Sequence, residues 1–337
     1  MSRILEKTPI KKVFELVQPE MAELEDRLLN KVSADSGMLK SIIQMVFNAG
    51  GKRIRPIISF LVFKALSQGK LSEEATEKVF LSAEIAELIH TASLVHDDII
   101  DNSLIRRGSE TLNSKLNNAI TVISGDFLFA RAAVNLGKLD CNEIVCLYAN
   151  VLQELCDGEI IQVEKKYSTE VDWEYYFKKN YKKTSSLIEA AAKAPACVLF
   201  QAGSVDEKTK NAMANYGRYL GDAFQIIDDV LDYTSDAETL GKPVGSDLKD
   251  GQITAPVLYA LEEGFEELKK IIPELASDET KLDEALNIIK ASNGIQKSLD
   301  KAEELVNKAK AELEVLPASE FKVALTNLAE YVVSRNK

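Results

Sequence analysis

The sequence LVHDDIID, residues 94–101, closes a long segment in which most residues are apolar. A similar sequence, QIIDDVLD at residues 225–232, closes another such segment later in the chain. In each copy the first and last aspartates are four residues apart, so a helix places both carboxylates on one face. The two copies therefore predict two helices that end in acidic clusters.

Helical periodicity extends over most of the chain. Residues 72–101 open with Ser72 and several glutamates, which suit a helix N-terminus, and then become apolar on nearly every face, as a central helix does. Apolar steps of three and four predict further helices at residues 10–33, 140–166, 172–202, 207–234, 253–270, 278–293, 296–315 and 318–335. Since there are only 16 glycines and 8 prolines and no linker, we predict an all-α fold and a single domain, residues 1–337.

Charge and hydropathy exclude several classes of protein. The chain has 41 lysines and arginines against 53 aspartates and glutamates, a net charge of −12, which argues against nucleic-acid binding and against basic attachment to anionic lipid. Residues 1–14 lack the apolar stretch of a signal peptide, and the apolar run at residues 57–63 is too short to cross a membrane. We expect a cytoplasmic protein without a transmembrane segment. Its four cysteines are expected to be buried reduced thiols: Cys141, Cys146, Cys156 and Cys197.

The paired aspartates indicate a metal site. Like charges one turn apart repel, oppose the helix dipole near a C-terminus and cost desolvation when they are buried. A hard divalent cation offsets all three effects, and Mg²⁺ accepts one or two carboxylates together with substrate phosphates. A calcium EF-hand is excluded because neither copy has the alternating oxygen ligands and central glycine of that loop. A solvated acidic helix end would explain one copy, but two copies followed by basic, glycine-containing loops favour magnesium.

The basic residues gather at a few positions. GGKRIRP, residues 50–56, is consistent either with a glycine cap and cations at the end of a helix at residues 36–49 or with a diphosphate cradle. Cations at residues 106–107, 182–183, 242 and 249 would form a second cradle. Both histidines precede Asp97. His96 is consistent with an ordinary core residue, whereas His90, two turns before Asp97, could donate to a diphosphate.

Several motifs together resemble those of the all-trans polyprenyl diphosphate synthases. In chain order they are GGKRIRP, LVHDDIIDNSLIRRG, GDFLFARA, the Lys-Thr pair of YKKTSSLI, GDAFQIIDDVLDYTSD and LGKPVGSDLKDGQITAP. The likeness runs from about residue 40 to about residue 260. The stretches TASLVHDDIID, LNSKLNNAITVISGDFLFA and DGQITAP are most similar to the solanesyl diphosphate synthase branch of cyanobacteria and plastids. The resemblance implies an antiparallel helical bundle of the isoprenoid synthase type around a central cavity, and a homodimer.

The resemblance also implies the reaction and the residues that perform it. The enzyme would add isopentenyl diphosphate head-to-tail to an allylic diphosphate, using Mg²⁺, with up to three ions per active site. The metal ligands would be Asp97, Asp98, Asp101, Asp228, Asp229 and Asp232. The allylic diphosphate would contact Arg106, Lys183 and Lys242, and isopentenyl diphosphate would contact Lys52, Arg55, His90 and Arg107. Thr184 and Gln225 would orient the leaving group and support the allylic cation.

Two positions bear on product length and one departs from the family pattern. In the family, bulky aromatic residues four or five positions before the first aspartate stop chain growth early. Ser93 and Ala92 occupy these positions here and are small, so we expect a product beyond C20, of about C40–C45. Gln252 stands where many relatives have lysine, which we interpret as a mark of the subfamily, with the contact either missing or made by Lys249.

Three alternatives remain. A geranylgeranyl diphosphate synthase would differ only in product length. A class I terpene cyclase usually carries an N-x-x-x-S-x-x-x-E second metal site and no cradle for isopentenyl diphosphate. A non-catalytic subunit of a heteromeric synthase commonly lacks one aspartate motif. Both aspartate motifs and GGKRIRP are present here, which favours the catalytic synthase.

Overall fold

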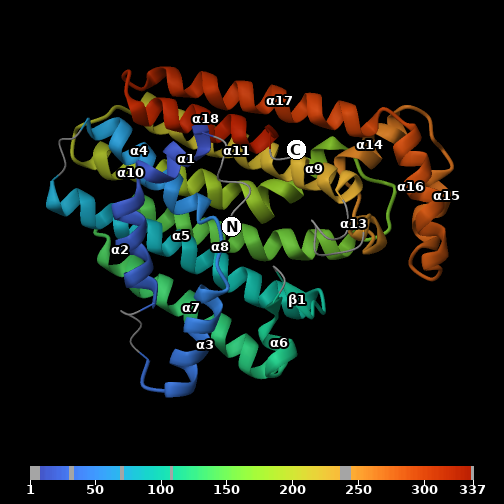
Figure 1. Ribbon diagram of the computed structural model, residues 1–337, viewed down its shortest axis with the longest axis horizontal. Coiled ribbons are helices and arrows are strands. Elements are labelled where there is room, and N and C mark those ends of the chain that lie inside the picture. Colours follow the sequence, from blue (N-terminus) through green and yellow to red (C-terminus); the bar gives the residue numbers. More distant parts are fainter. Residues whose placement is uncertain (1–7, 30–33, 69–71, 107–108, 236–243, 335–337) are drawn as a thin grey trace. The chain divides into compact units, whose positions relative to one another are not determined.

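The computed structural model describes residues 8–29, 34–68, 72–106, 109–235 and 244–334 of the chain (Figure 1). Nearly all of its regular structure is helical, which confirms the all-α prediction. The chain divides into two compact units. Unit 1 consists of Met1–Leu152, Glu189–Ala214 and Leu313–Leu328, and unit 2 of Gln153–Ile188, Asn215–Glu312 and Ala329–Lys337. The single domain over residues 1–337 remains a prediction.

Unit 1 contains the helices of the N-terminal part of the chain and one small β-hairpin. The helices are α1 (Thr8–Glu15), α2 (Gln18–Leu29), α3 (Gly37–Asn48), α4 (Ile54–Ser67), α5 (Glu73–Ile100), α6 (Leu112–Lys115) and α7 (Asn118–Lys138). The strands β1 (Ile105–Arg106) and β2 (Ser109–Glu110) pair antiparallel within the predicted loop. Helices that the unit boundaries cross are α8 (Asn142–Glu164), α10 (Ser186–Gln201), α11 (Glu207–Thr234) and α18 (Glu320–Ser334).

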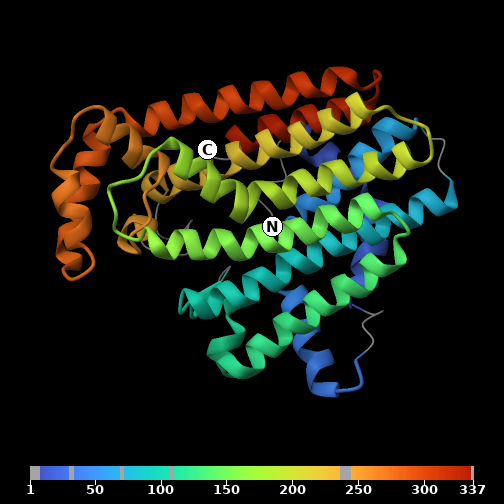
Figure 2. The same ribbon diagram turned by 180° about the vertical axis from the view of Figure 1, so that it is seen from behind.

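Helix α5 forms the centre of unit 1. It begins where the sequence predicts, because the Ser72 side chain accepts a hydrogen bond from the Ala75 amide at 3.1 Å. Its residues are buried on nearly every face up to Asp98. Helix α7 runs alongside it in both views (Figures 1 and 2). The helix that carries the first aspartate motif is therefore packed over most of its length.

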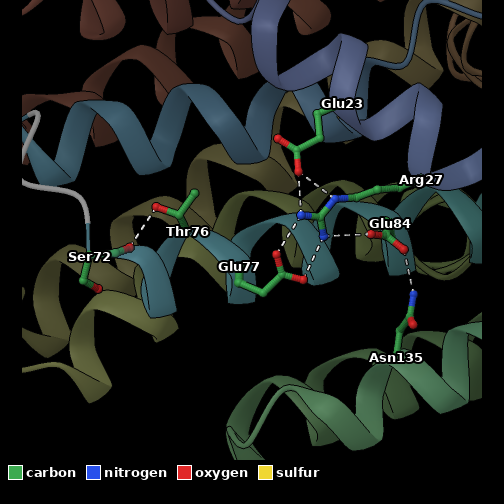
Figure 3. Close-up of polar contacts among 7 residues, drawn as sticks. All are labelled: Glu23, Arg27, Ser72, Thr76, Glu77, Glu84 and Asn135. Carbon is green, nitrogen blue, oxygen red and sulfur yellow. Dashed lines mark hydrogen bonds and ion pairs between the residues drawn. The ribbon is translucent and has the colours of Figure 1, made fainter. Parts of the chain in front are cut away.

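A polar cluster fixes the N-terminal half of α5 to its neighbours (Figure 3). Arg27 of α2 is paired with Glu77 of α5 at 2.7 Å and donates to Glu84 of α5 at 3.3 Å. Glu84 in turn accepts from the Asn135 amide of α7 at 3.0 Å. Glu84 and Asn135 are buried, and a buried carboxylate that keeps several donors ties the elements supplying them together.

The predicted helix over residues 10–33 is two helices, α1 and α2, separated at Leu16–Val17. Pro19 lies in the first turn of α2, where its missing amide hydrogen has no partner to lose and its fixed φ suits a helix start. Apolar periodicity alone did not reveal this break. A proline inside a periodic segment is the signal that marks it.

Unit 2 contains the shorter helices of the C-terminal half. These are α9 (Trp173–Asn180), a π-helical turn η1 (Tyr181–Ser185), α13 (Ser246–Lys249), α14 (Ala255–Glu262), α15 (Leu268–Glu274), the 3₁₀ turn η2 (Glu279–Lys281), α16 (Leu282–Ala291) and α17 (Gly294–Glu312). A further 3₁₀ turn, η3 (Leu313–Val315), begins the last segment of unit 1. The predicted helix 253–270 stops at Gly264, whose φ of 93° ends α14 in a left-handed conformation.

Two surface features differ from the sequence predictions. Cys141 and Cys197 are buried, but Cys146 and Cys156 on α8 are exposed, so the prediction of four buried thiols is wrong for two of them. Within the described ranges, one helix, α7, is long and apolar enough to cross a membrane by length and composition, and 39% of its apolar stretch is buried inside the chain. A core helix of a soluble protein passes the same test, so this observation decides nothing by itself.

Candidate active site

The first aspartate motif forms the C-terminal end of α5. The Asp101 amide donates to the Asp97 carbonyl at 2.8 Å, and the helix ends there. Asp98 is buried, whereas Asp97 is half-buried and Asp101 is exposed. Burial raises the pKa of Asp98, and the hydrogen bond from Arg106 Nε to Asp98 Oδ1, at 2.6 Å, opposes that shift. The motif thus presents two carboxylates outward and holds the third against a guanidinium.

The β1–β2 hairpin brings Arg106 to Asp98. The chain turns back after α5 because Asn102 adopts a left-handed φ of 49° and the Ser103 amide donates to the Asp98 carbonyl at 2.9 Å. The Asn113 side chain donates to the same carbonyl at 3.2 Å, a positioning role that the sequence did not reveal. The prediction for Arg107 lies outside the described residues.

The GGKRIRP segment joins α3 to α4. Gly50 follows the last turn of α3 with a φ of 76°, so the glycine-cap interpretation is confirmed. Arg53 begins α4, forms an ion pair with Glu87 and donates to the Phe47 carbonyl at 3.0 Å. The other two cations of the segment, Lys52 and Arg55, are exposed and half-buried, respectively. Their predicted contact with isopentenyl diphosphate remains a prediction.

The two histidines occupy different environments on α5. His96 Nε2 lies 3.1 Å from the Val122 carbonyl, and a Cβ added at Gly125 of α7 would lie only 2.2 Å from this ring atom. Gly125 therefore leaves room for the imidazole, and His96 is a packing residue, as the sequence interpretation allowed. His90 is half-buried, and its carbonyl accepts from the Ser93 hydroxyl at 2.9 Å. Its role toward a diphosphate remains a prediction.

The positions expected to set product length also lie on α5. Ala92 is fully buried and Ser93 is half-buried. Ser93 precedes Asp97 by one helical turn and shares its face. Both side chains are small, and their role in setting product length remains a prediction.

The second aspartate motif ends α11 in unit 2, and its three carboxylates have unequal environments. Asp229 is 2% exposed and accepts from Tyr176 Oη at 2.6 Å, from Gln225 Nε2 at 3.1 Å and from the Ala255 amide at 3.0 Å. Burial raises the pKa of Asp229 to about 6, although Lys179, Tyr176 and the Ala255 amide favour the charged form. This carboxylate therefore connects α9, α11 and the start of α14.

Asp232 anchors the segment that follows α11. Its carboxylate accepts from the Ser246 hydroxyl at 2.9 Å and from the Asp247 amide at 3.0 Å, and its carbonyl accepts from the Gly245 amide at 2.8 Å. A side-chain acceptor at the first amides of α13 is a helix cap. Asp228 is only half-buried and is the most accessible carboxylate of the second motif.

A π-helical turn carries the Lys-Thr pair. The sequence predicts one helix over residues 172–202, but Tyr181–Ser185 hold one extra residue per turn, a feature that frequently marks functional sites. Thr184 Oγ1 donates to Gln225 Oε1 at 3.0 Å, and Gln225 donates onward to Asp229. The predicted residues Thr184, Gln225 and Asp229 are thus brought into one chain of hydrogen bonds.

Two glycines allow the π turn to approach its neighbours. A Cβ at Gly221 of α11 would lie 2.6 Å from Ser185 Cα, and a Cβ at Gly158 of α8 would lie 2.8 Å from Lys183 Cγ. Lys183 forms an ion pair with Glu159 and donates to Gln162 at 3.1 Å. Because both partners are on α8, Lys183 is held against that helix.

Other predicted cations of unit 2 already have internal partners. Lys182 pairs with Glu154 and, at 3.1 Å, with Asp157. Lys249 pairs with Glu279 at 2.9 Å, which disfavours its taking over the role of the lysine missing at position 252. The Gln252 amide donates to the Asp247 carbonyl at 2.8 Å. The prediction for Lys242 falls outside the described residues.

Two buried residues of α9 were not predicted. Tyr176 donates to Asp229, and Lys179 is 5% exposed and electrostatically coupled to the same carboxylate. Their spacing to Lys183 does not predict this role, because a regular helix over residues 172–202 contains no π turn and so does not give the orientation of Tyr176 and Lys179 relative to it. Buried polar groups in this number indicate a site rather than a plain core.

The aspartates fit a hard cation that takes only some of its ligands from the protein. Among the described residues, no group of three or more His, Cys, Asp or Glu side chains is arranged to hold a metal ion alone. Asp101 is exposed and Asp97 and Asp228 are half-buried, whereas Asp98, Asp229 and Asp232 are buried. Magnesium commonly uses one or two carboxylates and completes its shell with water and phosphate oxygens, which this donor set permits.

Comparison with known proteins agrees with these features. The family model described as Polyprenyl synthetase matches residues 36–290. A prenyl transferase of Synechocystis sp. is 40% identical over 326 residues, covering 96% of this chain and 98% of the relative. Solanesyl-diphosphate synthase 2, chloroplastic, of Oryza sativa is 37% identical over 333 residues, covering 98% and 81%.

A solved structure shows the same fold. The polyprenyl synthase of Caulobacter crescentus, crystallised with calcium and isoprenyl diphosphate, is 31% identical, with a TM-score of 0.87. The similarity covers 97% of this chain and 98% of that chain. With a family model that matches most of its length and relatives that align nearly end to end, the chain belongs to the polyprenyl synthetase family and is a trans-polyprenyl diphosphate synthase.

Proposed function

We propose that this chain adds isopentenyl diphosphate in 1′–4 steps to an allylic diphosphate and releases a long-chain all-trans polyprenyl diphosphate of about C40–C45. The observation that carries the proposal is the chain of hydrogen bonds from Thr184 through Gln225 to Asp229, a carboxylate of the second aspartate motif. Relatives named solanesyl and octaprenyl diphosphate synthase support a long product.

Magnesium is the proposed cofactor, with up to three ions. The proposed ligands are the six motif aspartates, of which Asp101 is exposed and Asp97 and Asp228 are half-buried. When bound, the metal would supply positive charge to the departing diphosphate. Asp98, Asp229 and Asp232 are buried, and their contacts with Arg106, Tyr176 and Ser246 would also orient the two motifs.

The residues of the chain account for the remaining chemistry. The allylic C–O bond breaks and its electron pair leaves with the diphosphate, whose charge Arg106 and Lys183 would neutralise. The isopentenyl double bond then attacks the allylic cation, and the proton at C2 passes to the released diphosphate. Thr184 and Gln225 would orient the leaving group and support the allylic cation through their hydroxyl and amide dipoles. Thr184 donates to Gln225, and Gln225 donates to Asp229, which holds both in place. Lys52, Arg55, His90 and Arg107 would bind isopentenyl diphosphate. Lys242 would bind the allylic diphosphate.

Product sizing tests this function. Purified protein with Mg²⁺, isopentenyl diphosphate and farnesyl diphosphate should yield labelled products longer than C20, and the variant Ala92→Phe should shorten them, because a phenyl ring replaces a methyl group at a fully buried position. Products of wild type that stop at C20 would identify the alternative, a geranylgeranyl diphosphate synthase. Absence of elongation from both farnesyl and geranylgeranyl primers would refute prenyl transfer and leave the cyclase or the non-catalytic subunit.

We also propose a homodimer that uses α7. Val122, Ile123 and Val134 on this helix are 41%, 57% and 59% exposed, an unusual set for one apolar helix of a soluble chain. A second copy would cover them, and the mass in solution measured by light scattering should be twice that of one chain. The variant Ile123→Asp should shift the mass toward the monomer, whereas an unchanged mass would place the interface elsewhere. A cytoplasmic location remains a prediction.

A further inference from the structure

Lys179 on α9 is a buried cation without a close acidic partner. It is 5% exposed, and among the described residues of unit 2 its ammonium has neither a hydrogen bond nor an ion pair within 4 Å. The ring of Tyr176 lies beside it, with the ring centroid 5.7 Å from Nζ. An isolated ammonium is costly to bury, so its position requires an explanation.

The charges around Lys179 belong to the second aspartate cluster. Burial lowers the pKa of Lys179, and among the charges that act on it the strongest attraction comes from Asp229, followed by Asp247 and Glu159. Lys183 repels it. The relation is reciprocal, because Lys179 is the main charge that favours the ionised form of Asp229. The geometry agrees, because the Tyr176 ring next to the ammonium bears the hydroxyl that donates to Asp229 at 2.6 Å.

We propose that Lys179 is a fixed counter-cation of the second aspartate cluster, which keeps the cluster organised before any metal or diphosphate binds. Asp229 holds Tyr176, Gln225 and the Ala255 amide, and Asp247 donates its own amide to Asp232. Repulsion between these carboxylates would spread the segments that carry them. A cation that belongs to the protein offsets the repulsion permanently, as a magnesium ion would only when bound.

Lys179 is consequently a positioning residue that acts through Asp229. The carboxylate accepts from Gln225, and Gln225 accepts from Thr184, so a displacement of Asp229 would be passed to the proposed leaving-group contacts. Neutralising Lys179 should make the integrity of this part of unit 2 depend on added metal. The metal part of this expectation rests on the proposed function, whereas the metal-free part does not.

Thermal unfolding of the full chain tests the proposal with Lys179→Met and the matched control Lys178→Met, which removes an exposed lysine from the same helix. In EDTA the midpoint of Lys179→Met should fall by roughly 5 °C or more, because a buried charge loses its counter-charge, while that of Lys178→Met should stay within about 1 °C of wild type. Excess Mg²⁺ with inorganic diphosphate should raise the midpoint of Lys179→Met more than that of wild type.

A double variant separates the charge effect from packing. Because Asp229→Asn removes the negative charge that Lys179 balances, the double variant Lys179→Met/Asp229→Asn should unfold at a higher temperature than Lys179→Met alone. If Lys179→Met does not fold, recovery of folding in the double variant decides in favour. Equal midpoints for Lys179→Met and Lys178→Met in EDTA, or no recovery in the double variant, would overturn the proposal. None of these measurements requires catalytic turnover, so they test the role of Lys179 even if the elongation assay fails.

Discussion

Substituting Gly221 by alanine tests whether the π turn must lie close to α11. The new Cβ would lie 2.6 Å from Ser185 Cα, 2.8 Å from Ser185 Cβ and 2.9 Å from Ser185 Oγ. Carbon atoms in ordinary contact are about 3.5–4.0 Å apart, so the turn has to move by roughly 1 Å. The clashing atoms include backbone, which cannot rotate away as the end of a flexible side chain can.

The energetic and kinetic consequences follow from that displacement. Overpacking of a tight contact costs about 1–3 kcal/mol, while alanine gains roughly 0.5–1 kcal/mol over glycine in a helix, so we expect a net loss near 1–2 kcal/mol. A shift of about 1 Å would lengthen the 3.0 Å Thr184–Gln225 hydrogen bond beyond useful range and should lower kcat at least about 10-fold.

The assay pairs thermal unfolding with steady-state elongation, and Gly137→Ala is the control. Gly137 also lies in a helix, α7, but a Cβ there meets no atom within 4 Å. This control should gain stability by about 0.5–1 kcal/mol and keep its kcat. If Gly221→Ala is stabilised like Gly137→Ala and keeps full activity, the close approach of Ser185 does not constrain the turn.

Three further predictions concern other charged groups. Arg106→Met should reduce elongation at least about 10-fold and raise the KM for the allylic diphosphate, because both the proposed diphosphate contact and the partner of Asp98 are lost. An unchanged KM would argue against the diphosphate contact. Since Asp229 has a folded pKa of about 6, above its unfolded value, its protonation stabilises the metal-free protein below about pH 4, and this stability is lost as the pH rises through 6. As the pH rises from about 4 to well above 6, the free energy of unfolding in urea should therefore fall by about 3 kcal/mol more for wild type than for Asp229→Asn. Parallel pH curves for the two proteins would contradict this. Arg27→Met should lower the free energy of unfolding by about 2 kcal/mol, since buried Glu84 loses a charged donor; a change below about 0.5 kcal/mol in chemical denaturation would show that Asn135 alone suffices.

The sequence was sufficient where a residue's role depends on local pattern. The apolar segment that begins at Ser72 predicts α5, and the four-residue spacing of Asp97 and Asp101 predicts their common face. The Thr184–Gln225–Asp229 chain agrees with residues named before the structure. Their types were informative because aspartates and amides at the end of an apolar helix have no role in packing.

The sequence was insufficient where a role depends on contacts between distant segments. Asp232 accepts from Ser246 and Asp98 pairs with Arg106, and neither partner is fixed by spacing along the chain. Lys179 was missed because its proposed role depends on its position beside Tyr176 and Asp229, and Asp229 is 50 residues away in sequence. The break between α1 and α2 could have been found from Pro19.

The π turn at Tyr181–Ser185 introduces a phase shift between α9 and α10. One additional residue in a turn rotates everything before it by about 100° relative to an uninterrupted α-helix. The face of α9 that carries Tyr176 and Lys179 and the apolar face of α10 are therefore set independently, although the two helices are continuous in sequence. Deleting one residue within this turn would restore regular periodicity and would also turn Lys183 and Thr184 away from their partners. A helical wheel drawn through the whole segment places those two residues on the wrong side, and alignments of relatives should keep the length of this turn fixed.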